Sequence, residues 1–212
     1  MKKTTFILLL ICSMTIMTGC NQNRNNADGV VINGVKWATR NVGMPGTFAE
    51  TPECFGMLYV WNSKEAWNAI DKRVEGWRGV RRVEDSVWTR ANDPSPTGWR
   101  VPTYEEVWSL TDRERVRFEW TTQNGVEGVR FTDRQSRNSI FLPLVNIREF
   151  SLGNLRNEDD VTRIRVFYWT STENSRFLSH SAVYLTIWRQ NNNASLLAIN
   201  INYALPIRSV AE

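Results

Sequence analysis

Residues 30–38 read Val30-Val31-Ile32-Asn33-Gly34-Val35-Lys36-Trp37-Ala38, and this stretch sets the pattern for the chain that follows. Two short runs rich in β-branched and aromatic residues flank Asn33-Gly34. Asn-Gly is typical of the tight turn between antiparallel strands, because both residues tolerate a positive φ. The stretch therefore predicts a β-hairpin. A second hairpin is predicted where residues 118–122 and 126–132 flank Asn124-Gly125.

Further short apolar runs, separated by turn residues, predict strands along most of the chain. They cover residues 57–61, 139–144, 164–170, 182–188, 195–201 and 205–210. Two helices are predicted. One spans residues 63–74, where Trp67, Ile70 and Val74 share a helical face. The other follows Pro102, because Thr103 and Glu106 have the spacing of a capping box.

This order of elements predicts the fold class. Many short strands with two short helices and no βαβ rhythm predict one α+β domain, built on antiparallel sheet. We expect this domain to span residues 30–212.

The first twenty residues have the layout of a bacterial lipoprotein signal. Lys2 and Lys3 precede an apolar run at residues 6–11, and the sequence Met17-Thr18-Gly19-Cys20 resembles a lipobox. We therefore expect residues 1–19 to be removed and Cys20 to carry lipid. The alternative is a transmembrane anchor, but a spanning helix needs about 20 apolar residues, and polar residues interrupt this run early.

The lipid predicts a location and a partner. We expect a mature protein tethered to the cell envelope, at the outer membrane, with the polar residues 20–29 as a flexible linker. Loss of the signal removes two lysines and no acid, so the formal net charge falls from +4 to +2. Such a small charge gives no indication of nucleic-acid binding.

The cysteines restrict the covalent chemistry. Cys12 leaves with the signal and Cys20 is used for lipid, so only Cys54 remains. We expect no disulfide within the mature chain, and a small buried apolar role for Cys54.

Four stretches together resemble the Fibrobacter succinogenes major paralogous domain family. They are residues 32–43, Gly56-Met57-Leu58-Tyr59-Val60-Trp61, Gly98-Trp99-Arg100-Val101-Pro102-Thr103-Tyr104-Glu105-Glu106 and Tyr168-Trp169-Thr170-Ser171-Thr172-Glu173. The resemblance covers roughly residues 30 to 211 and rests on their combination. It implies a secreted or lipid-anchored envelope protein with a C-type-lectin-like fold, which is a mixed, mainly antiparallel sheet with few helices.

The resemblance also implies a relation between two serines. Relatives carry cysteine where this chain has Ser95 and Ser209. We infer that these residues lie close together, and that a serine pair replaces a disulfide.

Little in the sequence indicates catalysis or metal binding. His180 is the only histidine, and we expect it in a loop before a strand. Adjacent acids such as Glu105-Glu106 point in different directions, so they are no evidence for a catalytic pair. No calcium, zinc or other cofactor site is predicted.

Aromatic surface remains as a means of binding. We expect Trp37, Trp61, Trp99, Trp108 and Trp169 to fill the core. The candidate contacts for a glycan or a partner protein are Trp77 and Trp188, with Arg189 and Asn191 beside Trp188. Asp85-Ser86-Val87 resembles an O-glycosylation acceptor, which makes Ser86 a candidate modification site.

We therefore predict a non-catalytic, lectin-like recognition or structural module of the cell envelope. Its expected partners are the membrane, through lipid, and a glycan or another envelope protein. The alternatives are an enzyme acting on polysaccharide and an assembly or adhesin component. An enzyme would show two carboxylates across a deep cleft, and an assembly component would show an exposed apolar patch.

Overall fold

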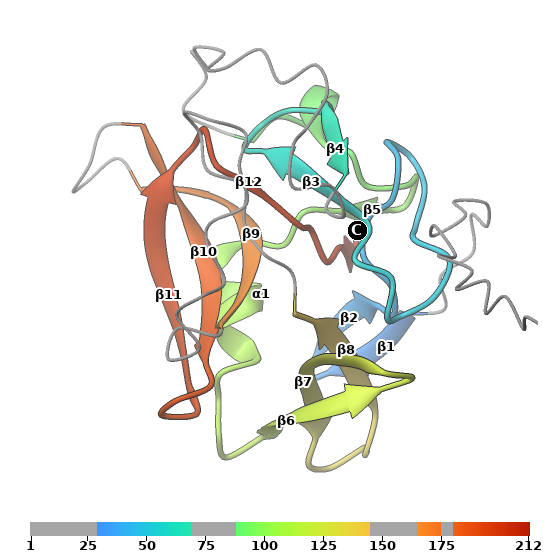
Figure 1. The fold of residues 1–212 in the computed structure, drawn as a ribbon, viewed down its shortest axis with the longest axis vertical. Coiled ribbons are helices and arrows are strands. Elements are labelled where there is room, and N and C mark those ends of the chain that lie inside the picture. Colours follow the sequence, from blue (N-terminus) through green and yellow to red (C-terminus); the bar gives the residue numbers. More distant parts are fainter. Residues whose placement is uncertain (1–28, 69–87, 145–164, 175–179) are drawn as a thin grey trace, which may run out of the picture.

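The computed structural model describes residues 29–68, 88–144, 165–174 and 180–212, and these residues form four small antiparallel sheets (Figure 1). The first sheet has the strand order β1-β2-β13-β5 and contains Gly29–Ile32, Val35–Ala38, Val210–Ala211 and Trp99–Arg100. The second, β12-β3-β4, contains Ala204–Leu205, Met57–Val60 and Ala66–Asn68.

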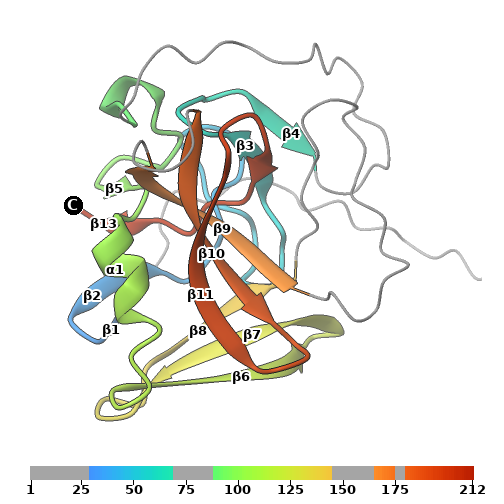
Figure 2. The ribbon, with the colours of Figure 1, turned by 90° about the vertical axis from the view of Figure 1, so that its left-hand side faces the viewer.

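The other two sheets have longer strands. One has the order β6-β7-β8 and contains Val116–Gln123, Val126–Asp133 and Ser139–Pro143. The other, β11-β10-β9, contains Asn193–Asn200, Ser181–Trp188 and Arg165–Glu173. The described residues add one α-helix, α1 (Tyr104–Ser109), and one 3₁₀ turn, η1 (Arg90–Asn92). Figure 2 shows α1 beside the sheet that contains β11.

Both predicted Asn-Gly hairpins are present. β1 pairs with β2 and β6 pairs with β7, each antiparallel. Asn33 and Gly34 have φ values of 46° and 82°, and Asn124 and Gly125 have 48° and 82°. Two consecutive positive φ angles match the type I′ turn, whose twist suits the flanking strands.

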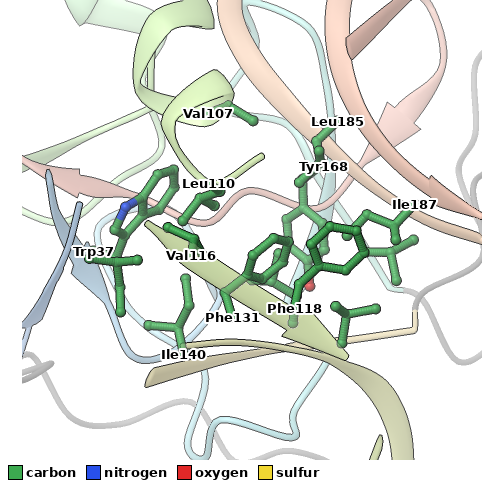
Figure 3. Close-up of a cluster of buried hydrophobic side chains, with 14 of the residues drawn as sticks. Trp37, Val107, Leu110, Val116, Phe118, Phe131, Ile140, Tyr168, Leu185 and Ile187 are labelled. Carbon is green, nitrogen blue, oxygen red and sulfur yellow. The ribbon is translucent and has the colours of Figure 1, made fainter. Parts of the chain in front are cut away.

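The main apolar core lies between α1 and the two longer sheets (Figure 3). Val107 and Leu110 reach it from the helix and its C-terminal end, Phe118 and Phe131 from β6 and β7, and Leu185 from β10. A second cluster surrounds Trp61 and Trp169. These two indoles are fully buried, and each donates a hydrogen bond to a backbone carbonyl, Thr170 at 3.0 Å and Tyr59 at 2.8 Å.

A buried arginine joins segments that are far apart in the sequence. Arg208 is 1% exposed. Its guanidinium donates to Oδ1 of Asn41 at 2.9 Å and to the carbonyls of Ala38 and Phe141 at 3.1 and 2.9 Å. Burial lowers the pKa of Arg208 to about 10. The three acceptors explain how the cation is tolerated inside the protein.

Ser95 and Ser209 meet, as inferred from the sequence. Their hydroxyl oxygens are 2.8 Å apart in a buried hydrogen bond. Ser95 precedes β5 and Ser209 precedes β13, and these strands pair with each other. The contact therefore lies where the end of the chain joins the first sheet.

The expected fold class is wrong. The described residues are mostly β-strand in four separate antiparallel sheets with one helix, in place of an α+β, lectin-like mixed sheet with two helices. The helix expected at residues 63–74 is wrong at residues 66–68, which form β4. Trp67 pairs with Leu58 of β3 and is buried against it, so cross-strand burial outweighs the helical spacing. Residues 69–74 lie outside the described ranges.

Candidate functional site

Helix α1 begins as the sequence predicts. The Thr103 side chain accepts from the backbone N–H of Glu106 at 3.4 Å, and the Thr103 N–H donates to Oε2 of Glu106 at 2.8 Å. This is the predicted capping box. Val107 and Leu110 then bury the inner side of the helix. Tyr104 and Trp108 are four residues apart and share another side.

The outer side of α1 carries an aromatic pair, the half-buried Tyr104 and the exposed Trp108. Their ring centroids are 6.0 Å apart with an interplanar angle of 8°. Trp108 is 52% exposed, so the expectation that it fills the core is wrong. Large exposed aromatic side chains are informative because burial is their usual state. The Tyr104 N–H also donates to Oγ1 of Thr172 at 2.9 Å, which fixes the start of the helix to β9.

The remaining core tryptophans fall in two groups. Trp37, Trp61 and Trp169 are buried, as expected. Trp99 is only half-buried; its ring meets Phe48 edge-on with centroids 5.5 Å apart.

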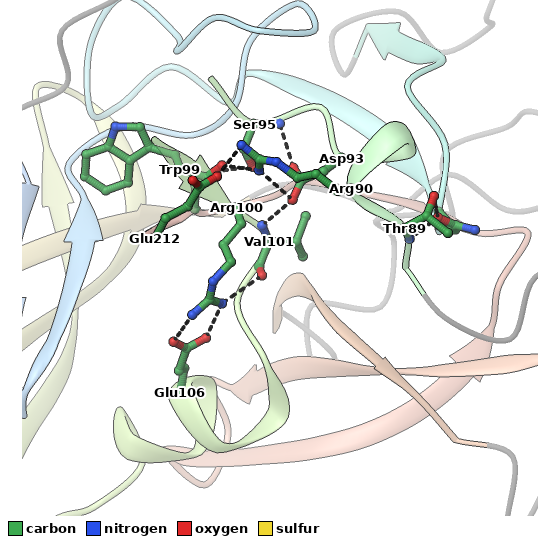
Figure 4. A network of polar contacts seen from close by, with 11 residues as sticks. Thr89, Arg90, Asp93, Ser95, Trp99, Arg100, Val101, Glu106 and Glu212 are labelled. Carbon is green, nitrogen blue, oxygen red and sulfur yellow. Dashed lines mark hydrogen bonds and ion pairs between the residues drawn. The ribbon is translucent and has the colours of Figure 1, made fainter. Parts of the chain in front are cut away.

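Glu106, on the same helix as the aromatic pair, is already bonded (Figure 4). Arg100 donates to both carboxylate oxygens of Glu106, at 2.7 and 2.6 Å. Burial raises the pKa of Glu106, but the bonds from Arg100 and the Thr103 N–H outweigh it, so the net pKa is lowered. Glu106 is therefore an ionised structural acceptor.

Asp93 also has a structural role. Its two oxygens accept from the backbone N–H groups of Ser95 at 2.8 Å and Val101 at 3.0 Å. Arg90 lies 3.7 Å from Asp93, donates to the carbonyl of Trp99 at 2.7 Å, and forms an ion pair with Glu212. These bonds hold the segment between η1 and β5 against the end of the chain.

A polar hollow of about 300 Å³ lies on this segment. It is lined by Pro45, Gly46, Lys64, Arg90, Asp93, Ser95 and Thr97. Asp93 is the one carboxylate in this lining, and both of its oxygens are bonded to backbone. The hollow therefore lacks the two facing carboxylates that glycoside hydrolysis requires.

The residues proposed as contacts around Trp188 are largely bonded within the protein. Arg189 donates to both oxygens of Glu127, at 3.3 and 2.7 Å, and its guanidinium lies 5.3 Å from the Trp120 ring centroid. Asn191 accepts the backbone N–H of Asn193 at 3.2 Å. Trp188 is half-buried. Their role as ligand contacts stays a prediction.

Three other predicted positions, Cys20, Trp77 and Ser86, lie outside the described residues. His180 is exposed and directly precedes β10, as expected, with a φ of 62°. Cys54 is half-buried and disulfide-bonded in the full chain; the expectation of no disulfide in the mature chain, which lacks Cys12, stays a prediction. The other cysteines, Cys12 and Cys20, are not among the described residues. A Cys20 sulfur bonded to lipid could not also bond to Cys54.

Among the described residues, no group of three His, Cys, Asp or Glu side chains is placed to hold a metal ion. No helix in the described ranges is long and apolar enough to span a membrane. No family model, curated protein or solved structure matches the chain.

Proposed function

We propose that this protein is a non-catalytic glycan-binding module of the bacterial envelope, and that the Tyr104–Trp108 pair is its contact surface. The observation that carries the proposal is the 52% exposure of Trp108 beside a nearly parallel tyrosine ring. A flat aromatic face packs against the C–H groups of a sugar ring. Its rigidity also makes the loss of side-chain entropy on binding small.

The groups around the pair suit binding. Glu105 is exposed and lies between the two rings in sequence, and Glu106 of the same helix forms a partly exposed ion pair with Arg100 of β5. Carboxylate and guanidinium groups can accept from and donate to sugar hydroxyls. The bonds that occupy Asp93 and Glu106 favour binding over hydrolysis.

The anchor in this proposal is lipid on Cys20, based on the Met17-Thr18-Gly19-Cys20 signal. The contact between Ser95 and Ser209 supports the resemblance to the Fibrobacter succinogenes major paralogous domain family. Labelling with palmitate tests the anchor. Wild type should incorporate the label and Cys20→Ala should not; an unlabelled wild type would contradict the anchor while leaving the glycan site untouched.

A glycan-array screen of the full chain in detergent tests the binding site. Wild type should bind a defined set of glycans. Trp108→Ala should weaken binding by about tenfold or more, since truncating a central tryptophan contact costs about 2 kcal/mol.

Trp188→Ala provides the matched control, because it also removes a tryptophan side chain, but from the surface around Trp188 that the sequence analysis predicted as a ligand contact. We expect it to retain binding. Loss of binding in Trp188→Ala alone would move the site to the β10–β11 loop. No glycan binding by the wild type would refute the proposal.

A further inference from the structure

Strand β11 is an open edge of its sheet. It pairs with β10 along eight residues without a register shift, and no strand in the described ranges pairs with its other side. Figure 2 shows this strand nearest the viewer. An open edge presents unpaired N–H and C=O groups to any second strand.

The sequence of β11 does not protect this edge. Asn193–Asn200 contains no charged residue and no proline. By contrast β6, at the edge of the β6-β7-β8 sheet, carries Arg117 and Glu119. Charged side chains, prolines and bulges are the usual means of preventing edge-to-edge pairing. Their absence from β11 indicates an edge that pairs.

The hydrogen bonds show which residues of β11 direct their backbone N–H and C=O groups away from β10. The N–H of Ile201 donates to the carbonyl of His180 at 3.0 Å, immediately after the ladder between β10 and β11. Backbone groups in an antiparallel ladder alternate in direction. The odd-numbered residues of β11 therefore bond to β10, and the outward backbone groups belong to Ala194, Leu196, Ala198 and Asn200. The Asn200 carbonyl already accepts the N–H of Tyr203 at 3.1 Å, which leaves its second lone pair for a partner.

A second copy of the strand fits this edge in one register. A twofold axis perpendicular to the sheet leaves each face of the sheet the same in both copies. Residues directly opposite each other must point to the same face, so the numbers of two paired residues are both even or both odd. The register that uses all four outward residues pairs Ala194 with Asn200 and Leu196 with Ala198, in both directions. Its axis then passes through Leu197.

Leu197 is an exposed large apolar residue, with 43% of its surface accessible. In this register it lies opposite Leu197 of the second copy, in a pair without direct hydrogen bonds, where side chains approach most closely. Ser195 lies opposite Ile199. No like charges meet along the strand.

We propose that β11 pairs with β11 of a second copy of this chain, centred on Leu197, to form a continuous six-stranded antiparallel sheet across a homodimer. The proposal is independent of the glycan site, because α1 contributes nothing to the edge.

Cross-linking of the full chain in detergent tests this register. Leu197→Cys would place two cysteines about 4.5 Å apart between Cα atoms, within the range that a disulfide bridges. Ser195→Cys is the matched control on the same face. Its two copies would lie roughly 13 Å apart along the strands, too far to bridge. Wild type gives the background from the natural cysteines.

We expect mild oxidation to produce several-fold more disulfide-linked dimer from Leu197→Cys than from Ser195→Cys or wild type. Adding Ala198→Pro to Leu197→Cys removes an outward N–H without breaking the ladder to β10, so the dimer should fall to background while circular dichroism stays unchanged. Equal yields at positions 195 and 197 would overturn the register. A wild-type protein that sediments as a monomer at all concentrations would overturn the dimer.

Discussion

Replacing the buried serine pair by cysteines should create a disulfide that stabilises the protein. In the double variant Ser95→Cys, Ser209→Cys, two sulfur atoms take the place of hydroxyl oxygens that are 2.8 Å apart. A disulfide needs a shorter separation, about 2.05 Å, but C–S bonds are longer than C–O bonds and bring the two sulfurs closer. We therefore expect the bond to form with little movement of β5 and β13.

The gain can be worked out from the positions of the two residues. They are 114 residues apart in sequence, and closing a loop of roughly 100 residues in the unfolded chain is worth about 4.7 kcal/mol. Losing the hydrogen bond between the hydroxyls costs about 1 kcal/mol. The net gain over wild type is then about 3 to 4 kcal/mol, which corresponds to about 10 °C in Tm for a domain of this size.

Thermal unfolding of the oxidised and reduced double variant measures this gain. Peptide mapping should first show the bond between positions 95 and 209 and no exchange with Cys54. Ser95→Cys alone is the control, and its Tm should not depend on oxidation. If the double variant stays reduced under conditions that oxidise accessible thiols, or if both forms melt together, the two segments do not meet as described.

Three further predictions concern stability. Arg208→Met should lower the free energy of unfolding by about 3 kcal/mol in denaturant titrations, because three buried acceptors lose their donor; an unchanged midpoint would contradict the network. Glu106 has a pKa lowered from 4.5, because hydrogen bonds from Arg100 and the backbone outweigh the effect of burial, and Asp133 has a pKa lowered from 3.8 by backbone N–H groups. Since both carboxylates have lower pKa values in the folded protein than in the unfolded chain, the free energy of unfolding should be constant above about pH 5 and fall in stronger acid. A pH titration of stability should show a shallower fall in Glu106→Gln than in wild type. Gly125→Ala should cost about 1 kcal/mol from its positive φ alone. Gly56→Ala should cost clearly more, because its Cβ would also clash with the carbonyl oxygen of Val42; equal losses of Tm would argue against that close approach.

The parts of the fold that were predictable depend on local chemistry. Asn and Gly both tolerate a positive φ, which the tight hairpin turn requires, so the local sequence is enough to predict the turns at Asn33-Gly34 and Asn124-Gly125. The capping box of Thr103 and Glu106 is equally local. The contact of Ser95 with Ser209 is long-range, and it could be inferred only because both positions differ together from the pattern of a family that the sequence resembles.

The failures come from interactions that the sequence does not display. Trp67 has helical spacing to its neighbours, but pairing with Leu58 makes residues 66–68 a strand. Trp108 lies two residues after the stretch Gly98 to Glu106, and the resemblance of that region to a known family predicted a buried side chain. Val107 and Leu110 already define the buried side of the short helix. Trp108 lies on another side, with Tyr104 one turn before it, and this spacing was the signal that could have predicted an exposed Trp108. Its exposure depends on how α1 packs against the sheets.

Oxidative footprinting of Trp108 in the full chain, with and without a saturating glycan identified on the array, tests the proposed contact most directly. If the sugar covers the Tyr104–Trp108 pair, peptide mapping will show that the glycan strongly slows oxidation of Trp108 while the half-buried Trp188 reacts as before. If Trp108 is oxidised equally fast when the glycan is bound, the ligand does not lie on α1 and the proposed binding surface is wrong.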